Sequence, residues 1–183
     1  MNTADANSGA LVLVDFQARL MPAIRNADAA VATAVLLARA ARLLGIPVLG
    51  TEQNPAGLGP NVDPVKAECD RTLQKMHFDA CADGLLEALQ DARGSYAQVV
   101  IAGCEAHVCL LQTALGLLRA GLQVMVVENA SASRCARDHT AALRRLSQAG
   151  ASIVTHEMVI FEWLHDCKHP RFKDVLDLVK SAG

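Results

Sequence analysis

This sequence of 183 residues has no long apolar run, no basic cluster and no leader-like N-terminus. Apolar residues make up 52% of the chain, yet no uninterrupted run approaches the ~20 residues that span a bilayer. The net charge is −2 and lysine and arginine form no block, which argues against nucleic acid and membranes as partners. The first nine residues are polar and include an acid, unlike a secretory signal. We therefore expect a cytoplasmic protein that acts on a small-molecule substrate.

The six cysteines also lack the spacing of metal-binding or redox motifs. No two are separated by two residues, so neither a zinc site nor a thioredoxin-like motif is indicated. A chain this apolar does not need disulfides, and reduced thiols are the simplest interpretation. The turn after residue 102 has one glycine where a dinucleotide-binding fingerprint has three. No cofactor is expected.

Apolar runs alternate with helical patterns along the chain, and neither a repeat nor a linker divides it. This alternation predicts one α/β domain, residues 1–183, with a polar N-terminal tail at 1–9. We expect a three-layer sandwich of Rossmann-like topology, with a mostly parallel central sheet and helices on both faces. The expected strands are 11–14, 46–50, 73–76, 98–102, 123–127 and 152–155, and the expected helices are 27–44, 83–92, 106–120, 137–149, 159–164 and 172–179. Residues 51–64 are expected to form a loop.

Three chemically active side chains lie at the ends of predicted strands, namely Asp15, Lys75 and Cys109. Ligands of a parallel α/β sheet bind beyond the carboxyl ends of its strands, so a base, a cation and a thiol would converge there. Each residue also has a structural interpretation. Asp15 could cap a helix or form a turn, Lys75 could be solvated, and Cys109 could be a small buried apolar residue.

Cys109 stands near the start of the helix expected at 106–120, just after an apolar stretch and Gly103. Unpaired N–H groups and the positive end of the helix dipole favour thiolate over thiol at such a position. A partly buried Lys75 beside Asp15 would lower the pKa of the thiol further. These features predict a cysteine that is nucleophilic at neutral pH.

Taken together, three segments resemble the isochorismatase-like cysteine hydrolases, a superfamily that includes nicotinamidases and N-carbamoylsarcosine amidases. They are Leu-Val-Asp-Phe-Gln ending at Gln17, Lys-Met-His-Phe starting at Lys75, and Gly-Cys-Glu-Ala-His-Val-Cys ending at Cys109. The resemblance covers most of the chain, and residues 51–60 and 103–109 are most similar to the branch of isochorismatase domain-containing proteins. It implies an α/β sandwich and a hydrolase of amides or related C–N bonds.

The resemblance also implies roles for single residues. Asp15, Lys75 and Cys109 would form a catalytic triad, with Cys109 as nucleophile and Asp15 as base. A cis peptide bond would join Cys104 to Glu105, so that the N–H groups of Glu105 and Cys109 form an oxyanion hole. Metal-binding relatives carry histidines between the first strand and the catalytic lysine, but this interval contains none here. No metal is therefore expected.

Further polar and aromatic residues near the expected strand ends are candidates for substrate binding. They are Gln17, Glu52, Gln53, Asn54, His77, Phe78 and His107. The residues that follow the second strand could equally form turns, and Gln17 could position its neighbours. His77 and His107 have structural roles as alternatives, and a core position is the alternative for Phe78.

Two functions from different classes fit these features. The first is a cysteine amidohydrolase that forms a thioester on Cys109, because relatives that cleave an enol ether lack this cysteine. The second is a catalytically silent oligomeric scaffold, against which the intact triad argues. The segment 106–120 is apolar over most of its circumference and should be covered on more than one side. We expect a homo-oligomer to cover it; the alternative is cover by residues 159–164 and the C-terminal helix.

Overall fold

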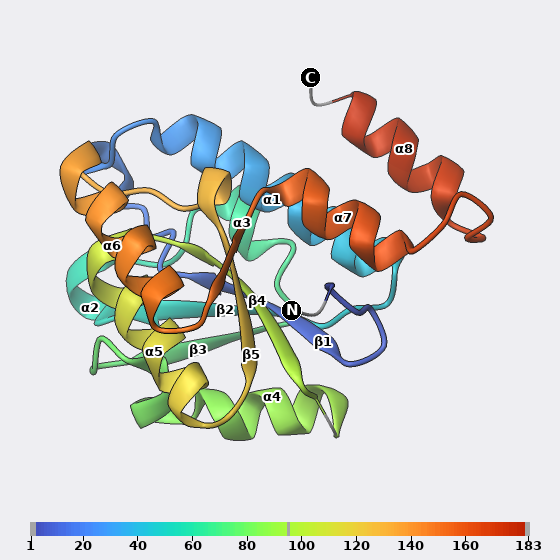
Figure 1. Ribbon diagram of the computed structural model, residues 1–183. Coiled ribbons are helices and arrows are strands. Elements are labelled where there is room, and N and C mark those ends of the chain that lie inside the picture. Colours follow the sequence, from blue (N-terminus) through green and yellow to red (C-terminus); the bar gives the residue numbers. More distant parts are fainter. Residues whose placement is uncertain (1–2, 95, 182–183) are drawn as a thin grey trace.

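A six-stranded parallel sheet with helices on both faces forms the centre of the protein (Figure 1). The computed structural model describes residues 3–94 and 96–181. The strands are β1 (Gly9–Val14), β2 (Val48–Gln53), β3 (Arg71–Lys75), β4 (Gln98–Gly103), β5 (Gln123–Val127) and β6 (Ser152–Val154), in the spatial order β3-β2-β1-β4-β5-β6. All neighbouring strands run parallel. The predicted α/β sandwich is confirmed.

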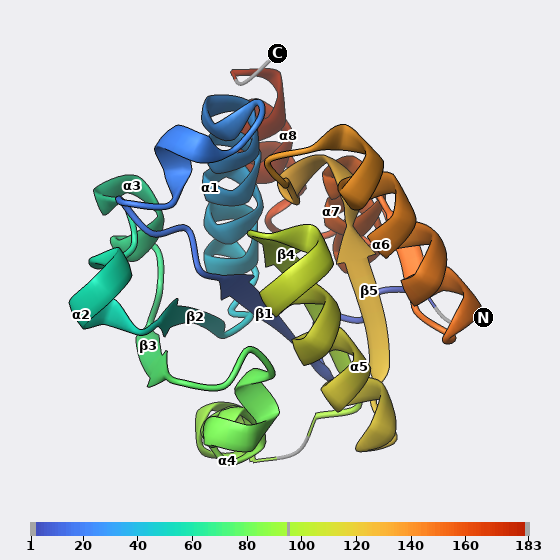
Figure 2. The same cartoon turned by 90° about the vertical axis from the view of Figure 1, so that its left-hand side faces the viewer.

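The longer helices divide between the two faces of the sheet (Figures 1 and 2). One face carries α1 (Ala27–Leu43), α7 (His156–Leu164) and α8 (Phe172–Lys180), and the other carries α4 (Leu85–Arg93), α5 (Leu111–Arg119) and α6 (Ala136–Gln148). The connections hold the short helices α2 (Pro55–Leu58) and α3 (Asp63–Lys66), the 3₁₀ turns η1 (Met21–Ala23), η2 (Ala80–Asp83) and η4 (Glu128–Ala130), and the π-helical turn η3 (Ala106–Leu110). No helix within the described residues is long and apolar enough to cross a membrane.

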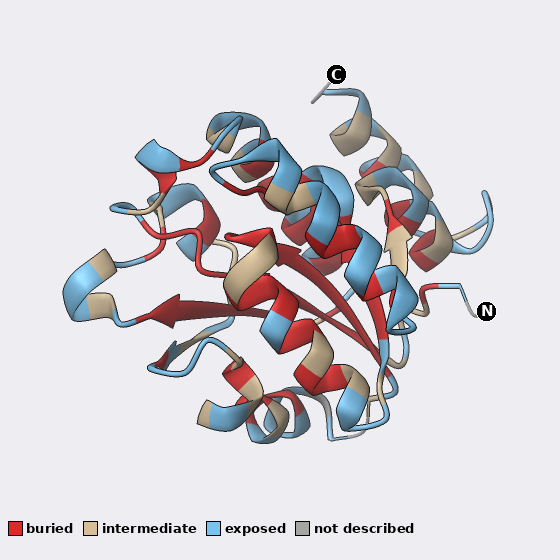
Figure 3. Cartoon of the chain, turned by 60° about the vertical axis from the view of Figure 1, so that its left-hand side comes forward, coloured by how far each residue is buried: buried red, intermediate tan, exposed pale blue. Residues whose placement is uncertain are grey.

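The sequence of β1 is continuously apolar and does not alternate with polar residues, because both faces of this strand are buried. Leu11 and Leu13 pack toward α1, whereas Val12 and Val14 pack toward α4 and α5. Helices cover both faces, so every residue of the strand is buried (Figure 3). A central parallel strand of this kind reads as a continuous hydrophobic run.

The order in which the chain adds strands to the sheet reverses between β1 and β4. The chain continues from β1 outward through β2 and β3, and later from β4 outward through β5 and β6. A crevice opens at such a switch point beyond the carboxyl ends of the strands. Gly103 closes β4 with φ 149°, and a Cβ atom here would overlap the carbonyl oxygen of Val14. Only glycine fits this contact, so the segments after β1 and β4 emerge side by side.

Several predicted boundaries were wrong because burial and pairing, not local composition, decided them. The polar tail predicted at 1–9 is shorter, since Gly9 belongs to β1 and Ala4 is buried, with its N–H donating to Glu162 Oε2 at 2.6 Å. Residues 1–2 of that tail lie outside the described residues. The loop predicted at 51–64 contains the end of β2, the helix α2 and the first two residues of α3. Strand β2 continues to Gln53 because its last residues pair with β3.

The helix predicted at 106–120 begins with the π-helical turn η3 and becomes α-helical at Leu111. Its cover within one chain comes from η2 and α6, whereas α7 and α8 pack against α1 on the opposite face. The alternative that residues 159–164 and the C-terminal helix cover it was therefore wrong. Gln112 and Arg119 are exposed on its outer side, and Leu115 is half-buried.

Candidate active site

A buried ion pair lies at the carboxyl ends of β1 and β3. Lys75 Nζ is 2.8 Å from Asp15 Oδ2, and neither side chain is exposed to solvent. The Thr51 hydroxyl donates to Asp15 Oδ1 at 2.6 Å, and the Asp15 N–H donates to the Thr51 carbonyl oxygen at 3.2 Å. A buried charge is costly unless it is paired, so each partner of the ion pair fixes the position of the other.

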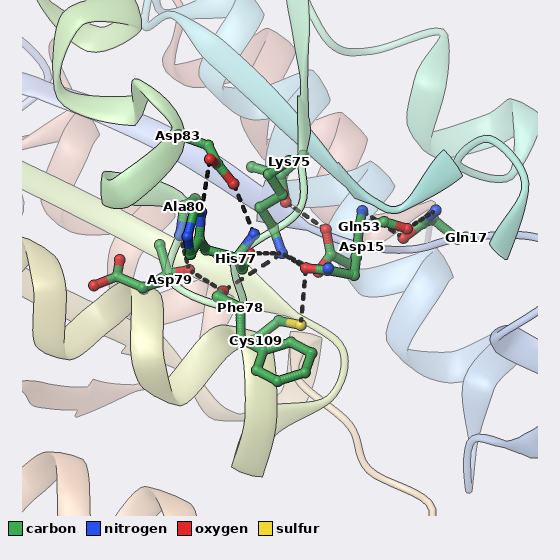
Figure 4. A network of polar contacts seen from close by, with 12 residues as sticks. Asp15, Gln17, Gln53, Lys75, His77, Phe78, Asp79, Ala80, Asp83 and Cys109 are labelled. Atoms are coloured by element: carbon green, nitrogen blue, oxygen red, sulfur yellow. Dashed lines mark hydrogen bonds and ion pairs between the residues drawn. The ribbon is translucent and has the colours of Figure 1, made fainter. Parts of the chain in front are cut away.

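Lys75 has further acceptors around its ammonium group (Figure 4). Gln53 Oε1 accepts from Lys75 Nζ at 2.7 Å, and the carbonyl oxygens of His77 and Phe78 lie 3.4 Å from it. An ammonium group has three N–H donors and no acceptor, and here it is surrounded by oxygen atoms. The cation is therefore held at one point beside Asp15.

Cys109 lies in the turn η3, which follows β4, and it is 7% exposed. Its thiol donates to Gln53 Oε1 over 3.9 Å. In Figure 4 the sulfur faces the point where Asp15, Gln53 and Lys75 meet. The structure thus brings together the base, the cation and the thiol that lie far apart in the sequence.

The acidity of this thiol differs from the prediction. Burial, and after it the Asp15 carboxylate, raise the pKa of Cys109 to about 12, while the Lys75 ammonium opposes the rise. The expected lowering was wrong because the helix-start argument did not include the cost of removing a thiolate from water. The resting group is a thiol, which must lose its proton before it can act as a nucleophile.

The peptide bond between Cys104 and Glu105 is cis, four residues before Cys109. Glu105 is 8% exposed, and its carboxylate accepts from the backbone N–H of Arg134 at 3.2 Å and from Arg134 Nε at 2.9 Å. The Glu105 carboxylate pairs with Arg134, which anchors the segment between β4 and η3. That the N–H groups of Glu105 and Cys109 bind an oxyanion stays a prediction.

Comparison with known proteins identifies the family of this chain. The Isochorismatase domain family matches residues 9–158. The chain belongs to the isochorismatase family. Isochorismatase domain-containing protein 2A of Mus musculus is 39% identical over 177 residues, which cover 95% of this chain and 84% of the relative.

Solved isochorismatase-like structures share the fold. The MAR1 ribonuclease of Caenorhabditis elegans is 34% identical, with a TM-score of 0.92 over 100% of this chain and 95% of that chain. The Escherichia coli YcaC gene product, described as an octameric hydrolase of unknown specificity, is 27% identical. Its TM-score is 0.84, over 98% of this chain and 96% of that chain. Membership of the isochorismatase family supports a hydrolase.

Two residues predicted to bind substrate have structural partners instead in this isochorismatase-family chain. Gln17 is fully buried, and its amide bonds to the backbone of Gln53 and to the carbonyl oxygen of Gly59. Glu52 is buried and accepts from the backbone N–H of Asn61 at 2.8 Å. Side chains of alternate strand residues point to opposite faces, so Glu52 turns away from the site that Gln53 reaches.

The other candidates lie around the site in different ways. Gln53 belongs to the network of Lys75 and Cys109, and the side chain of Phe78 is half-exposed (Figure 4). The exposed Asn54 stands at the start of α2, and the His77 ring bonds to Asp83 at 2.8 Å. His107 is half-buried and bonds to the Ser133 hydroxyl at 3.0 Å. Phe78 lies at the surface and not in the core.

Three residues of the site were missed by sequence reasoning. Thr51 bonds to Asp15, Thr113 bonds to the Phe78 carbonyl oxygen at 3.3 Å, and Asp83 accepts from the N–H groups of Met76 and His77. Thr51 pairs with Val14 in the register of β1 and β2, so strand pairing could have indicated it. No pattern in the sequence points to Asp83.

A metal site was not predicted, and the described residues offer none of the usual kind. Within 3–94 and 96–181, no three or more histidine, cysteine, aspartate or glutamate side chains are grouped to hold a metal ion. Activity without a metal stays a prediction.

Proposed function

We propose that this protein is a cysteine hydrolase that cleaves a small amide or a related C–N bond through a thioester on Cys109. The observation that carries the proposal is the buried cluster of Asp15, Lys75 and Cys109. A nucleophile, a base and a charge partner held together in this way are the parts needed for acyl transfer. The isochorismatase family and the hydrolase description of YcaC support it.

The first half of the reaction forms the acyl-enzyme. The Cys109 sulfur attacks the substrate carbonyl carbon as the thiol proton passes to Asp15, and a C–S bond forms. Lys75 stabilises the negative charge that develops on the sulfur as the proton leaves, since its ammonium already acts to lower the pKa of this thiol. The carbonyl oxygen becomes an oxyanion, for which the N–H groups of Glu105 and Cys109 are the expected donors. Asp15 then gives its proton to the nitrogen, and the C–N bond breaks.

The second half of the reaction regenerates the enzyme. Asp15, again a carboxylate, takes a proton from water as the water oxygen attacks the thioester carbon. The C–S bond then breaks, the sulfur regains the proton, and a carboxylic acid leaves. One water is consumed for each amide, and Cys109 and Asp15 return to their initial states.

The charges around Cys109 favour a neutral substrate. Lys75 is paired with Asp15, and Arg134 is paired with Glu105, so neither cation is free to bind an anion. This also argues against RNA as the substrate, although a MAR1 ribonuclease is among the similar structures. RNA binding depends on cations that can contact phosphates, and the net charge of this chain is −2.

Mass spectrometry of the intact protein after incubation with a panel of small neutral amides tests the proposal. We expect a mass increase on Cys109 equal to the acyl group, and release of the acid. Cys109→Ala is the matched control, because it removes the sulfur atom of a buried residue and leaves the rest of the site in place. This variant should form no adduct. If no amide gives an adduct or an acid and the protein cleaves an RNA oligonucleotide, the proposed amide hydrolase would be wrong and a nuclease would take its place. Inert behaviour toward both would favour the scaffold function.

We also propose that the protein works as a homo-oligomer. The YcaC structure with the same fold is octameric. The outer side of α5 leaves Leu115 half-buried between the exposed Gln112 and Arg119, close in sequence to Cys109. A second copy packed there would cover this side.

A further inference from the structure

Gln53 occupies an unusual position for a residue expected to bind substrate. Its side-chain oxygen accepts from both reactive partners, from Lys75 Nζ at 2.7 Å and from the Cys109 thiol at 3.9 Å. The residue is 8% exposed, so little of it faces a ligand. Its amide is therefore committed to the catalytic residues.

The orientation of this amide is fixed by its other end. Gln53 Nε2 donates to the carbonyl oxygen of Met76 at 2.7 Å. A flipped amide would place its NH₂ group against the ammonium of Lys75 and its oxygen against the Met76 carbonyl, which are two repulsive contacts. Only the orientation with oxygen toward Lys75 satisfies all the groups.

The backbone of Gln53 is fixed as well, by a reciprocal pair with Gln17. The Gln53 N–H donates to Gln17 Oε1 at 2.8 Å, and Gln17 Nε2 donates to the Gln53 carbonyl oxygen at 3.0 Å. Gln17 follows Asp15 by two residues, so this pair connects the end of β2 to the segment that carries the base (Figure 4). The side chain of Gln53 thus extends from a fixed point.

We propose that Gln53 is a positioning residue, whose amide oxygen holds the ammonium group of Lys75 beside Asp15 and Cys109. This proposal rests on the proposed hydrolase function only for the reason why Lys75 must be held in place. The contacts of Gln53 themselves do not depend on that function. Gln53 acts through Lys75 and does not react. Gln17 holds the backbone of Gln53 in place through the two hydrogen bonds described above.

The physical reason lies in the competing acceptors of Lys75. The carbonyl oxygens of His77 and Phe78, at 3.4 Å, offer the ammonium group an alternative position away from the thiol. Without the Gln53 oxygen, the cation has only Asp15 and these carbonyls as acceptors and shifts toward them. The negative charge that develops on Cys109 then loses part of its stabilisation.

The test is the rate at which iodoacetamide alkylates Cys109 in four proteins. They are the wild type, Gln53→Met, Lys75→Met and the double variant; methionine keeps the length of both side chains and removes their polar ends. The Cys109 peptide is followed by mass spectrometry, because Cys135 and Cys167 are exposed and also react. Rates are measured from about pH 6 to about pH 9, where a thiol with a raised pKa reacts in proportion to its thiolate fraction.

We expect Gln53→Met to slow alkylation by about threefold or more at every pH, and Lys75→Met to slow it by about tenfold, since a neighbouring cation shifts a pKa by about one unit or more. In the Lys75→Met background, Gln53→Met should then change the rate by less than about twofold, because residues that act through one another are not additive. Gln148→Met, at the exposed end of α6, is the matched control and should react like the wild type.

Two outcomes would overturn the proposal. One is an unchanged alkylation rate in Gln53→Met. The other is an equal change of rate by Gln53→Met with and without Lys75, which would show that Gln53 does not act through Lys75. Faster alkylation would show that its oxygen acts on the thiol directly and stabilises the protonated form. Circular dichroism confirms folding, and Lys75→Gln replaces Lys75→Met as the background if the latter does not fold. Because no amide substrate is used, failure of the hydrolase function would appear in the amide panel and leave this comparison intact.

Discussion

Replacing Asp15 with asparagine should change two reactions of Cys109 in opposite directions. The carboxylate of Asp15 helps to raise the pKa of the thiol, so its removal lowers that pKa. Loss of one negative charge in contact with the sulfur corresponds to about one pKa unit, or about 1.4 kcal/mol. Alkylation by iodoacetamide at pH 7 should therefore become about tenfold faster. Hydrolysis should fall by about 10²–10⁴-fold, because the base is gone.

The same variant tests the ion pair. Asparagine tolerates the left-handed backbone of residue 15, whose φ is 54°, so the end of β1 keeps its shape. Lys75 remains buried without its carboxylate, which costs about 3–5 kcal/mol when a buried pair is broken. For a chain of this size that lowers the melting temperature by roughly 6–20 °C. The Gln53 oxygen still accepts from Lys75 and limits the loss.

The assays are alkylation of the Cys109 peptide, turnover of whichever amide acylates the wild type, and thermal melting followed by circular dichroism. Slower alkylation in Asp15→Asn would refute the assigned electrostatics, since the carboxylate would then favour the thiolate. Turnover near that of the wild type would refute the role of Asp15 as base. An unchanged melting temperature would show that the ion pair contributes little to the free energy of unfolding.

The remaining predictions concern the cation, the pH dependence, metals and assembly. Lys75→Ala should slow alkylation of Cys109 by about tenfold at pH 7, because Lys75 lowers the pKa of the thiol, and an unchanged rate would contradict this. In the wild type the alkylation rate should rise about tenfold per pH unit from about pH 6 to about pH 9, because the pKa is raised to about 12; a plateau below pH 8 would indicate a much more acidic thiol. Dialysis against a strong chelator should leave amide turnover unchanged, and a loss that zinc, manganese or iron restores would show a metal requirement. Light scattering at micromolar concentration should give a mass above the 19.4 kDa of one chain, and a mass of one chain would argue against the homo-oligomer.

The fold was predictable because its signal is local and repeated. Continuous apolar strands alternate with helical patterns, and this alternation fixes a parallel sheet with two covered faces. Boundaries that depend on distant partners were less accurate. Strand β2 extends through Thr51 and Gln53 only because β1 and β3 pair with it, and the sequence around residues 51–53 reads as a loop.

The site was predictable as a set of residues but not as an arrangement. Asp15, Lys75 and Cys109 were identified by their strand ends and by the family resemblance. The commitment of Gln53 to Lys75 depends on the register between β2 and β3, which no single segment contains. The direction of the Cys109 pKa was wrong because it depends on how deeply the folded chain buries the sulfur.

The left-handed backbone at Asp15 limits the evolutionary paths open to this protein. Asparagine and glycine adopt that conformation easily, whereas β-branched residues do so at a high cost. Both are one nucleotide away from an aspartate codon, and both remove the carboxylate. A lineage that kept the fold for binding and lost catalysis could therefore diverge by one point mutation at position 15. A later change at position 75 would remove the lysine left without its carboxylate, so paired substitutions at these two positions would mark such a descendant.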